Sequence, residues 1–566
     1  MAFYLSQPKL LVLNIAPIIL FCFLFWFIGK SAWRAFLLAS IVSMAYSFAE
    51  YWKLMSRSET VYAEELLLLS EALEMSERYI SITREMLVIL ALIIVETLLL
   101  RFFFRGKPGS IRMRIALSAA AVAVGIVGYQ TVYTSEAVYD SLDVWEELNP
   151  WFENSQYISR GGLYPFIYSI QYAVPEKPEG YDKDQAEQTL LEYQTDDISE
   201  DQEISVISIM FEAFCDLSEY TDSITGQDPY EDYHTLQQES YSGHLFTNIF
   251  AGGTIDTERC VLTGFSELTN FRTPSWSYAR YFADQGYSIN GSHSGYQAFY
   301  NRSEVNRNLG FEEYLFLENH YSELYDGIAP DDVLLPEITR ICQEQMEQGN
   351  AVFSYNVTYQ NHGPYSDTEQ YFEEEYIPQE GLSYESYVIA NNYLSGVADT
   401  GEQMLAMADA FRDAEEPVVL LFFGDHKPWL GEQSSVYAEL GIDIASDSDQ
   451  SMYHYYQTEY LVWANDAAKQ VMGHDCTGEG PTISPCFLMN VVFELCGWEG
   501  PSYMKLTDEV RELTPIVSSN DIFWEKEALV TENELSKTAK EAVTCMRQVQ
   551  YYLAQDAGGE LPQEDK

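Results

Sequence analysis

The sequence predicts an α/β protein: an N-terminal multi-span transmembrane helical region, followed by a mostly parallel β-sheet sandwiched by helices. The first 135 residues are strongly apolar and hold many of the basic residues, whereas the rest is acidic. In the acidic part, strand-like runs alternate with helical segments, as in a parallel sheet covered on both faces. With 566 residues, 47% of them hydrophobic, the chain can form a large core beside its membrane region.

Four apolar stretches are long enough to cross the ~30 Å hydrocarbon core of a bilayer. They are Leu10–Ile28, Ala35–Trp52, Met86–Phe104 and Ile115–Tyr133. Each is too long for the apolar part of a signal peptide, and no small-residue cleavage site follows the first. Between the second and third spans, Lys53–Glu85 has a short Leu-rich centre flanked by Glu, which is typical of an interfacial or re-entrant helix.

Basic residues near the span ends predict the orientation. The loop between the third and fourth spans is the richest in them, and the loop between the first and second carries two more: Arg101, Arg105, Lys107, Arg112 and Arg114, then Lys30 and Arg34. Because basic loops face the cytoplasm, the amino terminus and the large acidic domain are expected outside. The sequence therefore predicts a multi-pass cell-membrane protein with an extracytoplasmic domain.

Composition excludes some functions. The formal net charge is −56, from 87 acidic and 31 basic residues, and this field repels nucleic acid. The eight cysteines have no zinc-ribbon spacing and form no disulfide framework, while a Cys476–Cys486 bridge stays open. We expect transmembrane residues 1–134, a membrane-proximal helical linker at 135–202, a folded domain at 203–555 and a polar disordered tail at 556–566.

The folded domain begins with a strand-like run and repeats the pattern. The predicted strands lie within Ile204–Phe214, Gly286–His293, Asn350–Tyr365 and Pro417–His426, and the predicted helices are Arg272–Gln285, Asp331–Gln348 and Ser386–Asp413. A polar side chain stands where each strand run gives out: Glu212, His293, His362, Asp425 and His426. Parallel strands end at one edge of a sheet, so we expect these side chains to converge there.

Two of these features have a plain structural alternative. Adjacent Asp425 and His426 offer an oxygen and a nitrogen to a divalent metal, but they also fit a turn with a capping Asp and a surface His. Gly252 and Gly253 precede Thr254 and a helix-forming run. A hydroxyl at a helix N-terminus can meet an anion such as phosphate, or it can simply cap the helix.

Together these stretches resemble the lipoteichoic acid synthase and membrane phosphoglycerol transferase family, part of the alkaline phosphatase/sulfatase superfamily. The resemblance rests on SIMFEAF, GGTIDTE, SHSGYQAFYNRSEVNRNLGF, QNHGPY and FFGDHKP, which occur in the family's order. It covers most of residues 135–555 and implies that 203–555 is a sulfatase-like, extracytoplasmic catalytic domain. It also implies a role in cell wall biogenesis.

The resemblance implies that Glu212, Thr254, Asp425 and His426 bind one divalent metal, typically Mn²⁺ and sometimes Mg²⁺. Thr254 would be the nucleophile that becomes phosphoglycerylated. A Thr hydroxyl has too high a pKa to attack phosphorus unaided, and a bound cation lowers it.

Further residues are assigned to the substrate by the same resemblance. His362 would contact the phosphate or the leaving group and carry a proton, Tyr300 and Arg302 would hold the glycerol phosphate headgroup, and His293 matches another active-site histidine. The implied reaction moves glycerol phosphate from phosphatidylglycerol to a hydroxyl of a membrane glycolipid or polyglycerolphosphate polymer, both at the lipid bilayer.

The chain departs from the family at three points. Ala213 stands where many members have Ser, Tyr300 stands where the family often has Trp, and four spans replace the usual five. Three alternatives stay open: a phosphoethanolamine transferase, a related phosphodiester hydrolase, or a catalytically inactive acidic surface scaffold. A sulfatase reaction is disfavoured because the chain lacks a Cys or Ser in the C/S-x-P-x-R context from which formylglycine is made.

Overall fold

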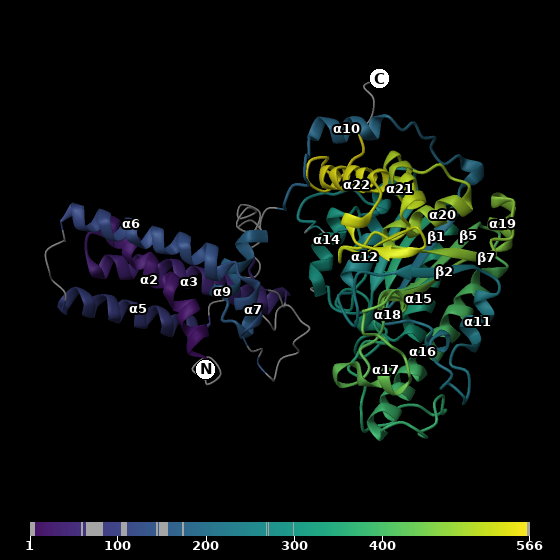
Figure 1. The fold of residues 1–566 in the computed structure, drawn as a ribbon, viewed down its shortest axis with the longest axis horizontal. Helices are drawn as coiled ribbons and strands as arrows, with labels where there is room; N and C mark the ends of the chain where they lie inside the picture. Colours follow the sequence, from purple (N-terminus) through teal and green to yellow (C-terminus); the bar gives the residue numbers. More distant parts are fainter. Residues whose placement is uncertain are drawn as a thin grey trace. The chain divides into compact units, whose positions relative to one another are not determined.

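The computed structural model describes residues 6–57, 60–63, 83–103, 110–142, 145, 157–172, 175–267, 269, 271–297 and 299–562. The chain divides into two compact units, Met1–Glu176 and Lys177–Lys566 (Figure 1). The division falls inside the segment 135–202 that the sequence marks as a linker. Each unit has its own set of packed elements.

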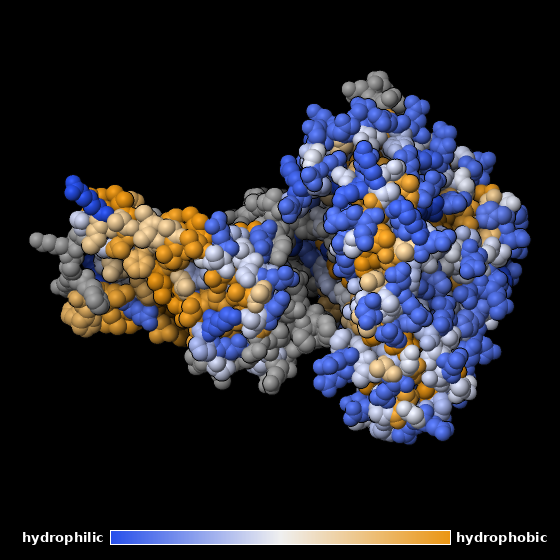
Figure 2. Space-filling model, in the orientation of Figure 1, coloured by the Kyte–Doolittle hydropathy of each residue, from blue (hydrophilic) through white to orange (hydrophobic). Residues whose placement is uncertain are grey.

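The first unit is built from long apolar helices. They are α2 (Pro8–Gly29), α3 (Ala32–Arg57), α5 (Arg84–Phe103) and α6 (Ile111–Gly128), the last continued by a π-helical turn at Tyr129–Tyr133. Among the described residues, four helices are long and apolar enough to cross a membrane, and they coincide with the four predicted spans. Their apolar side chains are largely exposed (Figure 2), as expected of surfaces that contact lipid. The chain is a membrane protein.

The rest of the first unit is held by a polar residue inside a span. Asn14 of α2 donates from Nδ2 to the Arg160 carbonyl at 2.9 Å, and its Oδ1 accepts from the Tyr164 amide at 3.0 Å. Tyr164 lies in the first turn of the short helix α9 (Leu163–Ser169), which comes after α7 (Glu136–Asp140) along the chain. Most of the predicted interfacial segment Lys53–Glu85 lies outside the described residues, although its first residues extend α3 to Arg57.

A mixed sheet forms the centre of the second unit. Its described strands run in the order β3-β4-β1-β5-β6-β2-β7. Their bounds are β1 (Ser205–Phe211), β2 (Tyr241–Phe246), β3 (Ser288–His293), β4 (Val352–Val357), β5 (Val418–Gly424), β6 (Gln457–Ala464) and β7 (Gly478–Ile483). β3, β4, β1 and β5 are parallel, β6 is antiparallel to both of its neighbours, and β7 is parallel to β2. All four predicted strands are confirmed, whereas β2, β6 and β7 were not predicted.

Helices cover both faces of this sheet (Figure 1). Their bounds are α10 (Lys183–Leu191), α11 (Glu231–Gln237), α12 (Ile255–Thr263), α13 (Tyr278–Asp284), α14 (Arg302–Asn308), α15 (Asp331–Met346), α16 (Tyr384–Arg412), α17 (Ser435–Glu439), α18 (Asp449–Tyr456), α19 (Asp466–Met472), α20 (Leu488–Cys496), α21 (Ser502–Leu513) and α22 (Lys537–Gln555). A small hairpin, β8 (Phe523–Glu525) and β9 (Ala528–Val530), completes the unit.

The core lies in two layers because alternate strand residues face opposite sides. In β1, Val206 and Met210 join the core under α12, α13 and α20 to α22, while Ile207 and Ile209 join the core under α11, α15 and α16. The predicted helix at Arg272–Gln285 is wrong at its start. The helix α13 begins at Tyr278, because Pro274 disfavours a helix before it and the Ser277 side chain accepts from the Arg280 amide as N-cap.

The structure also describes the cysteines and most of the C-terminal tail. All eight cysteines are free thiols, and both Cys476 and Cys486 are buried without forming the bridge that the sequence left open. In the predicted disordered tail 556–566, Ala557 and Leu561 pack against the core, and residues 563–566 lie outside the described chain.

Candidate metal-dependent active site

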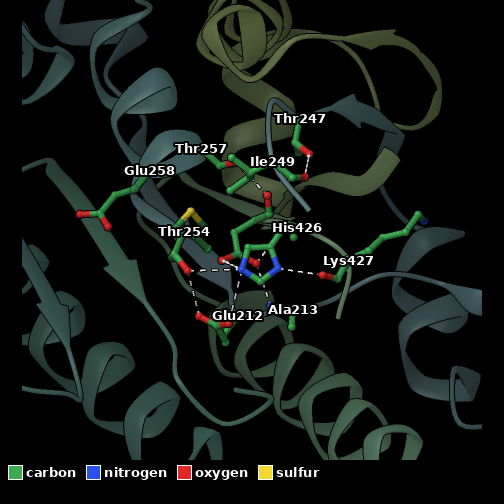
Figure 3. A network of polar contacts seen from close by, with 12 residues as sticks. Glu212, Ala213, Thr247, Ile249, Thr254, Thr257, Glu258, His426 and Lys427 are labelled. Carbon is green, nitrogen blue, oxygen red and sulfur yellow. Dashed lines mark hydrogen bonds and ion pairs between the residues drawn. The ribbon is translucent and has the colours of Figure 1, made fainter. Parts of the chain in front are cut away.

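Four side chains from three separate segments meet at the carboxyl edge of the sheet. Glu212 follows β1, Asp425 and His426 follow β5, and Thr254 stands immediately before α12. Thr254 Oγ1 donates to Glu212 Oε2 at 3.2 Å and lies 3.5 Å from His426 Nε2 (Figure 3). His426 Nε2 is 3.3 Å from Asp425 Oδ2 and 3.6 Å from Glu212 Oε1. All four side chains are buried.

Thr254 does not behave as an ordinary helix cap. Its side chain makes no capping hydrogen bond to α12, and its hydroxyl turns instead to Glu212. The approach to the helix depends on Gly252 and Gly253, whose φ angles of +141° and +86° are strained for any residue with a Cβ. The local sequence therefore presents a hydroxyl, backed by a helix N-terminus, to two carboxylates and an imidazole.

Backbone contacts hold the Asp425 and His426 side chains in place. Asp425 Oδ1 accepts from the amides of Ala213 and His426, both at 2.7 Å, whereas Oδ2 accepts no hydrogen bond from the described residues and lies 3.3 Å from His426 Nε2. His426 donates from Nδ1 to the Lys427 carbonyl at 2.9 Å, so that Nε2 carries the lone pair facing the cluster. Fixing the second nitrogen in this way orients a histidine for metal binding.

The charges in the cluster call for a cation. Burial and, to a lesser degree, the neighbouring Asp425 carboxylate raise the pKa of Glu212 to about 8, against the opposing effect of His426. One ligand atom each from Glu212, Asp425 and His426 lies within 4.8 Å of the other two. Two carboxylates, an imidazole and a hydroxyl, with a buried Asp425 oxygen that accepts no hydrogen bond from the described residues, fit a divalent metal.

The two predicted substrate histidines lie elsewhere on this edge. His293 is buried and donates from Nδ1 to the Val357 carbonyl at 3.1 Å, and its Nε2 has no partner in the described chain. Burial, Arg302 and His362 lower the pKa of His293 well below its ordinary value, so this imidazole is neutral. His362 is half-buried and stacks on Tyr359 with ring centroids 4.6 Å apart. Among the described contacts, neither histidine bonds to the four clustered residues.

Arg302 is committed to a partner that the sequence did not reveal. Its Nε and Nη2 both donate to Glu258 Oε2, at 2.9 and 2.7 Å, and both side chains are buried. Glu258 lies on α12 one turn after Thr254, and the helical spacing in GGTIDTE was the available signal. Arg302 also lies 5.2 Å from the ring centre of the half-exposed Tyr300, whose carbonyl accepts from Arg259.

We expect Glu258→Gln to destabilise the fold, because it leaves the buried Arg302 charge without its partner. The loss of unfolding free energy should be about 3–5 kcal/mol, read as a lower Tm of the full chain in detergent. Glu344→Gln is the matched control, since its pair with Arg340 is exposed and such pairs contribute less than about 1 kcal/mol. Equal Tm values for the two variants would contradict the assignment.

A buried carboxyl supports the loop that carries His362. Asp331 Oδ2 accepts from Thr400, which accepts in turn from Asn361, and the Asp331 amide donates to Gln360 Oε1. Burial raises the pKa of Asp331 to about 7. The folded state therefore holds a proton that the unfolded state has released, and the associated stability is lost as the pH rises from about 4 to about 7.

Asp331→Asn should remove this pH dependence while keeping an acceptor for Thr400. The Tm of Asp331→Asn minus that of the wild-type chain should increase as the pH rises from 5 to about 7, and this difference should stay constant above pH 7. Parallel Tm curves across this range would show that Asp331 does not hold the proton.

Comparison with known proteins places this chain in a family. A family model described as "Sulfatase" matches residues 205–497, the segment that contains the sheet and the clustered site. The chain belongs to the sulfatase family, and its second unit is an enzyme domain of the alkaline phosphatase/sulfatase superfamily, whose members are metal-dependent. This agrees with the resemblance in the motifs.

One curated relative is a Rhizobium meliloti (strain 1021) protein named "Putative cyclic beta-1,2-glucan modification protein". It is 25% identical over 434 residues, which cover 73% of this chain and 65% of that protein. This chain therefore matches less than two thirds of the relative's length.

Among solved structures, the Streptococcus pyogenes phosphoglycerol transferase GacH with sn-glycerol-1-phosphate is 18% identical, with a TM-score of 0.49, covering 67% of this chain and 95% of that one. The Listeria monocytogenes lipoteichoic acid synthase LtaP is 16% identical, with a TM-score of 0.47, covering 68% and 100%. The Neisseria meningitidis lipooligosaccharide phosphoethanolamine transferase EptA is 12% identical, with a TM-score of 0.39, covering 81% and 84%.

Proposed function

We propose that this protein is a membrane-anchored, metal-dependent transferase that moves glycerol phosphate from phosphatidylglycerol to a hydroxyl of a polymer or glycolipid. The observation that carries the proposal is the Thr254 hydroxyl, which makes no cap bond and lies against Glu212 and His426. This arrangement suits a nucleophile whose proton must leave and whose oxygen must meet phosphorus.

The metal ligands in this proposal are Glu212, Thr254, Asp425 and His426, and the metal is Mn²⁺, with Mg²⁺ accepted. The bound cation would supply positive charge beside the Thr254 oxygen and the phosphoryl group. The absence of a hydrogen bond to Asp425 Oδ2 among the described residues and the raised pKa of Glu212 support this assignment, because both carboxylates gain from a nearby positive charge.

The chain's own residues carry the two transfers. Thr254 Oγ1 attacks the phosphorus of phosphatidylglycerol, its bond to phosphorus forms, and the bond from phosphorus to the diacylglycerol oxygen breaks. The leaving oxygen takes a proton, for which His362 is the proposed donor, and His293 with its free Nε2 faces the same edge. In the second transfer an acceptor hydroxyl attacks phosphorus and gives its proton to His362. The bond to Thr254 breaks, and the Thr254 oxygen regains the proton that Glu212 took in the first transfer.

The surroundings of Tyr300 favour a glycerol headgroup over an ethanolamine one. Arg302 lies over the Tyr300 ring, and Arg259 donates to the Tyr300 carbonyl. Because Glu258 offsets the charge of Arg302, Arg259 leaves one positive charge beside Tyr300, which disfavours the ammonium of ethanolamine and suits phosphate oxygens and glycerol hydroxyls. An anchored, extracytoplasmic domain would meet donor lipids in the outer leaflet, and the name of the Rhizobium meliloti relative supports a sugar hydroxyl as acceptor.

The test uses the full chain in detergent with Mn²⁺ and radiolabelled lipids. We expect diacylglycerol release from phosphatidylglycerol and none from phosphatidylethanolamine. Release from phosphatidylethanolamine alone would identify a phosphoethanolamine transferase. Release from neither lipid would favour the inactive scaffold, and release with water as the only acceptor would identify a hydrolase.

A further inference from the structure

A second group of potential metal ligands lies apart from the catalytic cluster. It consists of Glu219, His244 and Glu459, and one ligand atom of each lies within 4.8 Å of the other two. We propose that these three residues form a second divalent-cation site, of the kind that zinc occupies with imidazole and carboxylate ligands. Its ligands are distinct from the four residues assigned to the catalytic metal.

Two of the ligands are fixed by the sheet itself. His244 on β2 and Glu459 on β6 are directly paired across the antiparallel ladder, so their side chains leave the same face of neighbouring strands. Glu219 arrives from the 3-10 turn Leu217–Glu219, which follows the loop carrying Glu212. A site built on paired strands is held more precisely than one built on loops alone.

The distances suit a small cation. His244 Nε2 lies 3.0 and 3.3 Å from the two Glu219 carboxylate oxygens. Ligand atoms bound to zinc at about 2.0–2.2 Å in a tetrahedral arrangement are about 3.4 Å apart, so the observed separation needs little adjustment. The side chains of His244 and Glu219 are each about one third exposed, which leaves a path for an ion from solvent.

The environment of Glu459 indicates that a cation binds here. Its side chain is 2% exposed, and its Oε1 is buried without a hydrogen-bond partner among the described residues, while Oε2 accepts from the Asp216 amide at 2.9 Å. A buried carboxylate oxygen without a partner is costly unless a cation or a proton satisfies it. Burial raises the pKa of Glu459 to about 8, against the opposing effects of Lys427 and His244.

The nearby Lys427 does not pair with the buried Glu459 oxygen. Its Nζ is buried without a hydrogen-bond partner in the described chain and sits 4.0 Å from the Tyr220 ring centre. Lys427 lowers the pKa of Glu459, but the described ion pairs include none between them. When a divalent ion displaces the proton of Glu459, Glu219 and Glu459 together carry one negative charge more than Lys427 offsets, so the ion gains from binding.

A metal at this position would tie three parts of the fold together. It would join β2, β6 and the turn that ends the Glu212–Glu219 loop. Because that loop supplies a catalytic ligand, we expect the ion to raise thermal stability by fixing it.

The experiment counts bound zinc on the full chain in detergent after chelation, reloading with Zn²⁺ alone and desalting. An Asp425→Asn background removes the catalytic site, so the count does not depend on the proposed transferase activity. We expect one zinc per chain in that background and none after adding Glu459→Gln, with zinc raising the Tm only in the first. Glu219→Gln, at an exposed position, gives the same test if Glu459→Gln fails to fold.

His320→Ala is the matched control, because His320 forms a 2.7 Å ion pair with Glu337 that belongs to neither ligand group. It should leave the zinc count unchanged. The proposal is overturned if the Asp425→Asn chain retains no zinc, or if Glu459→Gln and Glu219→Gln both leave the count and the Tm shift as they were.

Discussion

Replacing Thr254 with alanine is expected to reduce diacylglycerol release from phosphatidylglycerol by about a thousand-fold or more, because the alanine side chain has no oxygen that can attack phosphorus. Thr254→Ser keeps the oxygen and should retain activity within about 100-fold of the wild-type rate, since only a buried methyl group is lost. The measurement is the initial rate of release of labelled diacylglycerol at saturating Mn²⁺.

A control separates loss of the nucleophile from loss of the site. Glu212, Asp425 and His426 remain in Thr254→Ala, so Mn²⁺ should still raise the Tm of this variant, although by less than in the wild-type chain. Incubation with labelled phosphatidylglycerol should leave label on the wild-type protein and none on Thr254→Ala. An unchanged rate, or equal labelling of both proteins, would remove Thr254 from the mechanism.

Replacing Asp425 with asparagine should abolish activity. It should also separate two effects of the Asp425 carboxylate, namely metal binding and the raised pKa of Glu212. In the metal-free protein burial, and after it the Asp425 carboxylate, holds the pKa of Glu212 at about 8, above its ordinary value of 4.5. The folded state thus loses stability as the pH rises between these values, and Asp425→Asn should relieve part of that loss. At pH 8 without metal, Asp425→Asn should therefore be more stable than the wild-type chain. With Mn²⁺ at the same pH, the wild-type chain should be more stable than Asp425→Asn.

Thermal unfolding at pH 5 and pH 8, with chelator or with Mn²⁺, measures both effects. The Tm of the wild-type chain should rise on adding Mn²⁺, and that of Asp425→Asn should hardly change. Activity of the chelated wild-type chain should return with Mn²⁺, as metal-dependent chemistry requires. If Asp425→Asn gains as much Tm from Mn²⁺ as the wild-type chain, Asp425 is not a ligand.

Elements with strong local signals were predictable from the sequence. The four spans are long apolar runs, and β1, β3, β4 and β5 are apolar stretches bounded by breaks in the pattern. The convergence of Glu212, Asp425 and His426 follows from the parallel-sheet rule, since β1 and β5 are neighbours in the sheet. Thr254 joined them because the Gly252–Gly253 turn brings the start of α12 to the same edge.

Other elements could not be predicted because their conformation depends on contacts with residues that are distant in the sequence. β2 reads YSGHLF and β6 opens with Gln457, Thr458 and Glu459, which hide the strand pattern although all of β6 is buried. The helix predicted from Arg272 starts at Tyr278 because a proline and a capping serine decide its boundary. The commitment of Arg302 to Glu258 also depends on two helices that are 44 residues apart at that contact.

The amino-acid order alone determined that this chain has membrane spans, a mostly parallel sheet and polar residues at the strand ends, because apolar length and periodicity are local properties. Only the tertiary structure decided which polar atoms share one space: that the Thr254 hydroxyl faces Glu212 instead of capping its helix, and that Glu219, His244 and Glu459 form a second group. The physical reason is that burial, unpartnered oxygens and charge repulsion arise from atoms far apart in the sequence, and strand pairing and helix packing fix those distances.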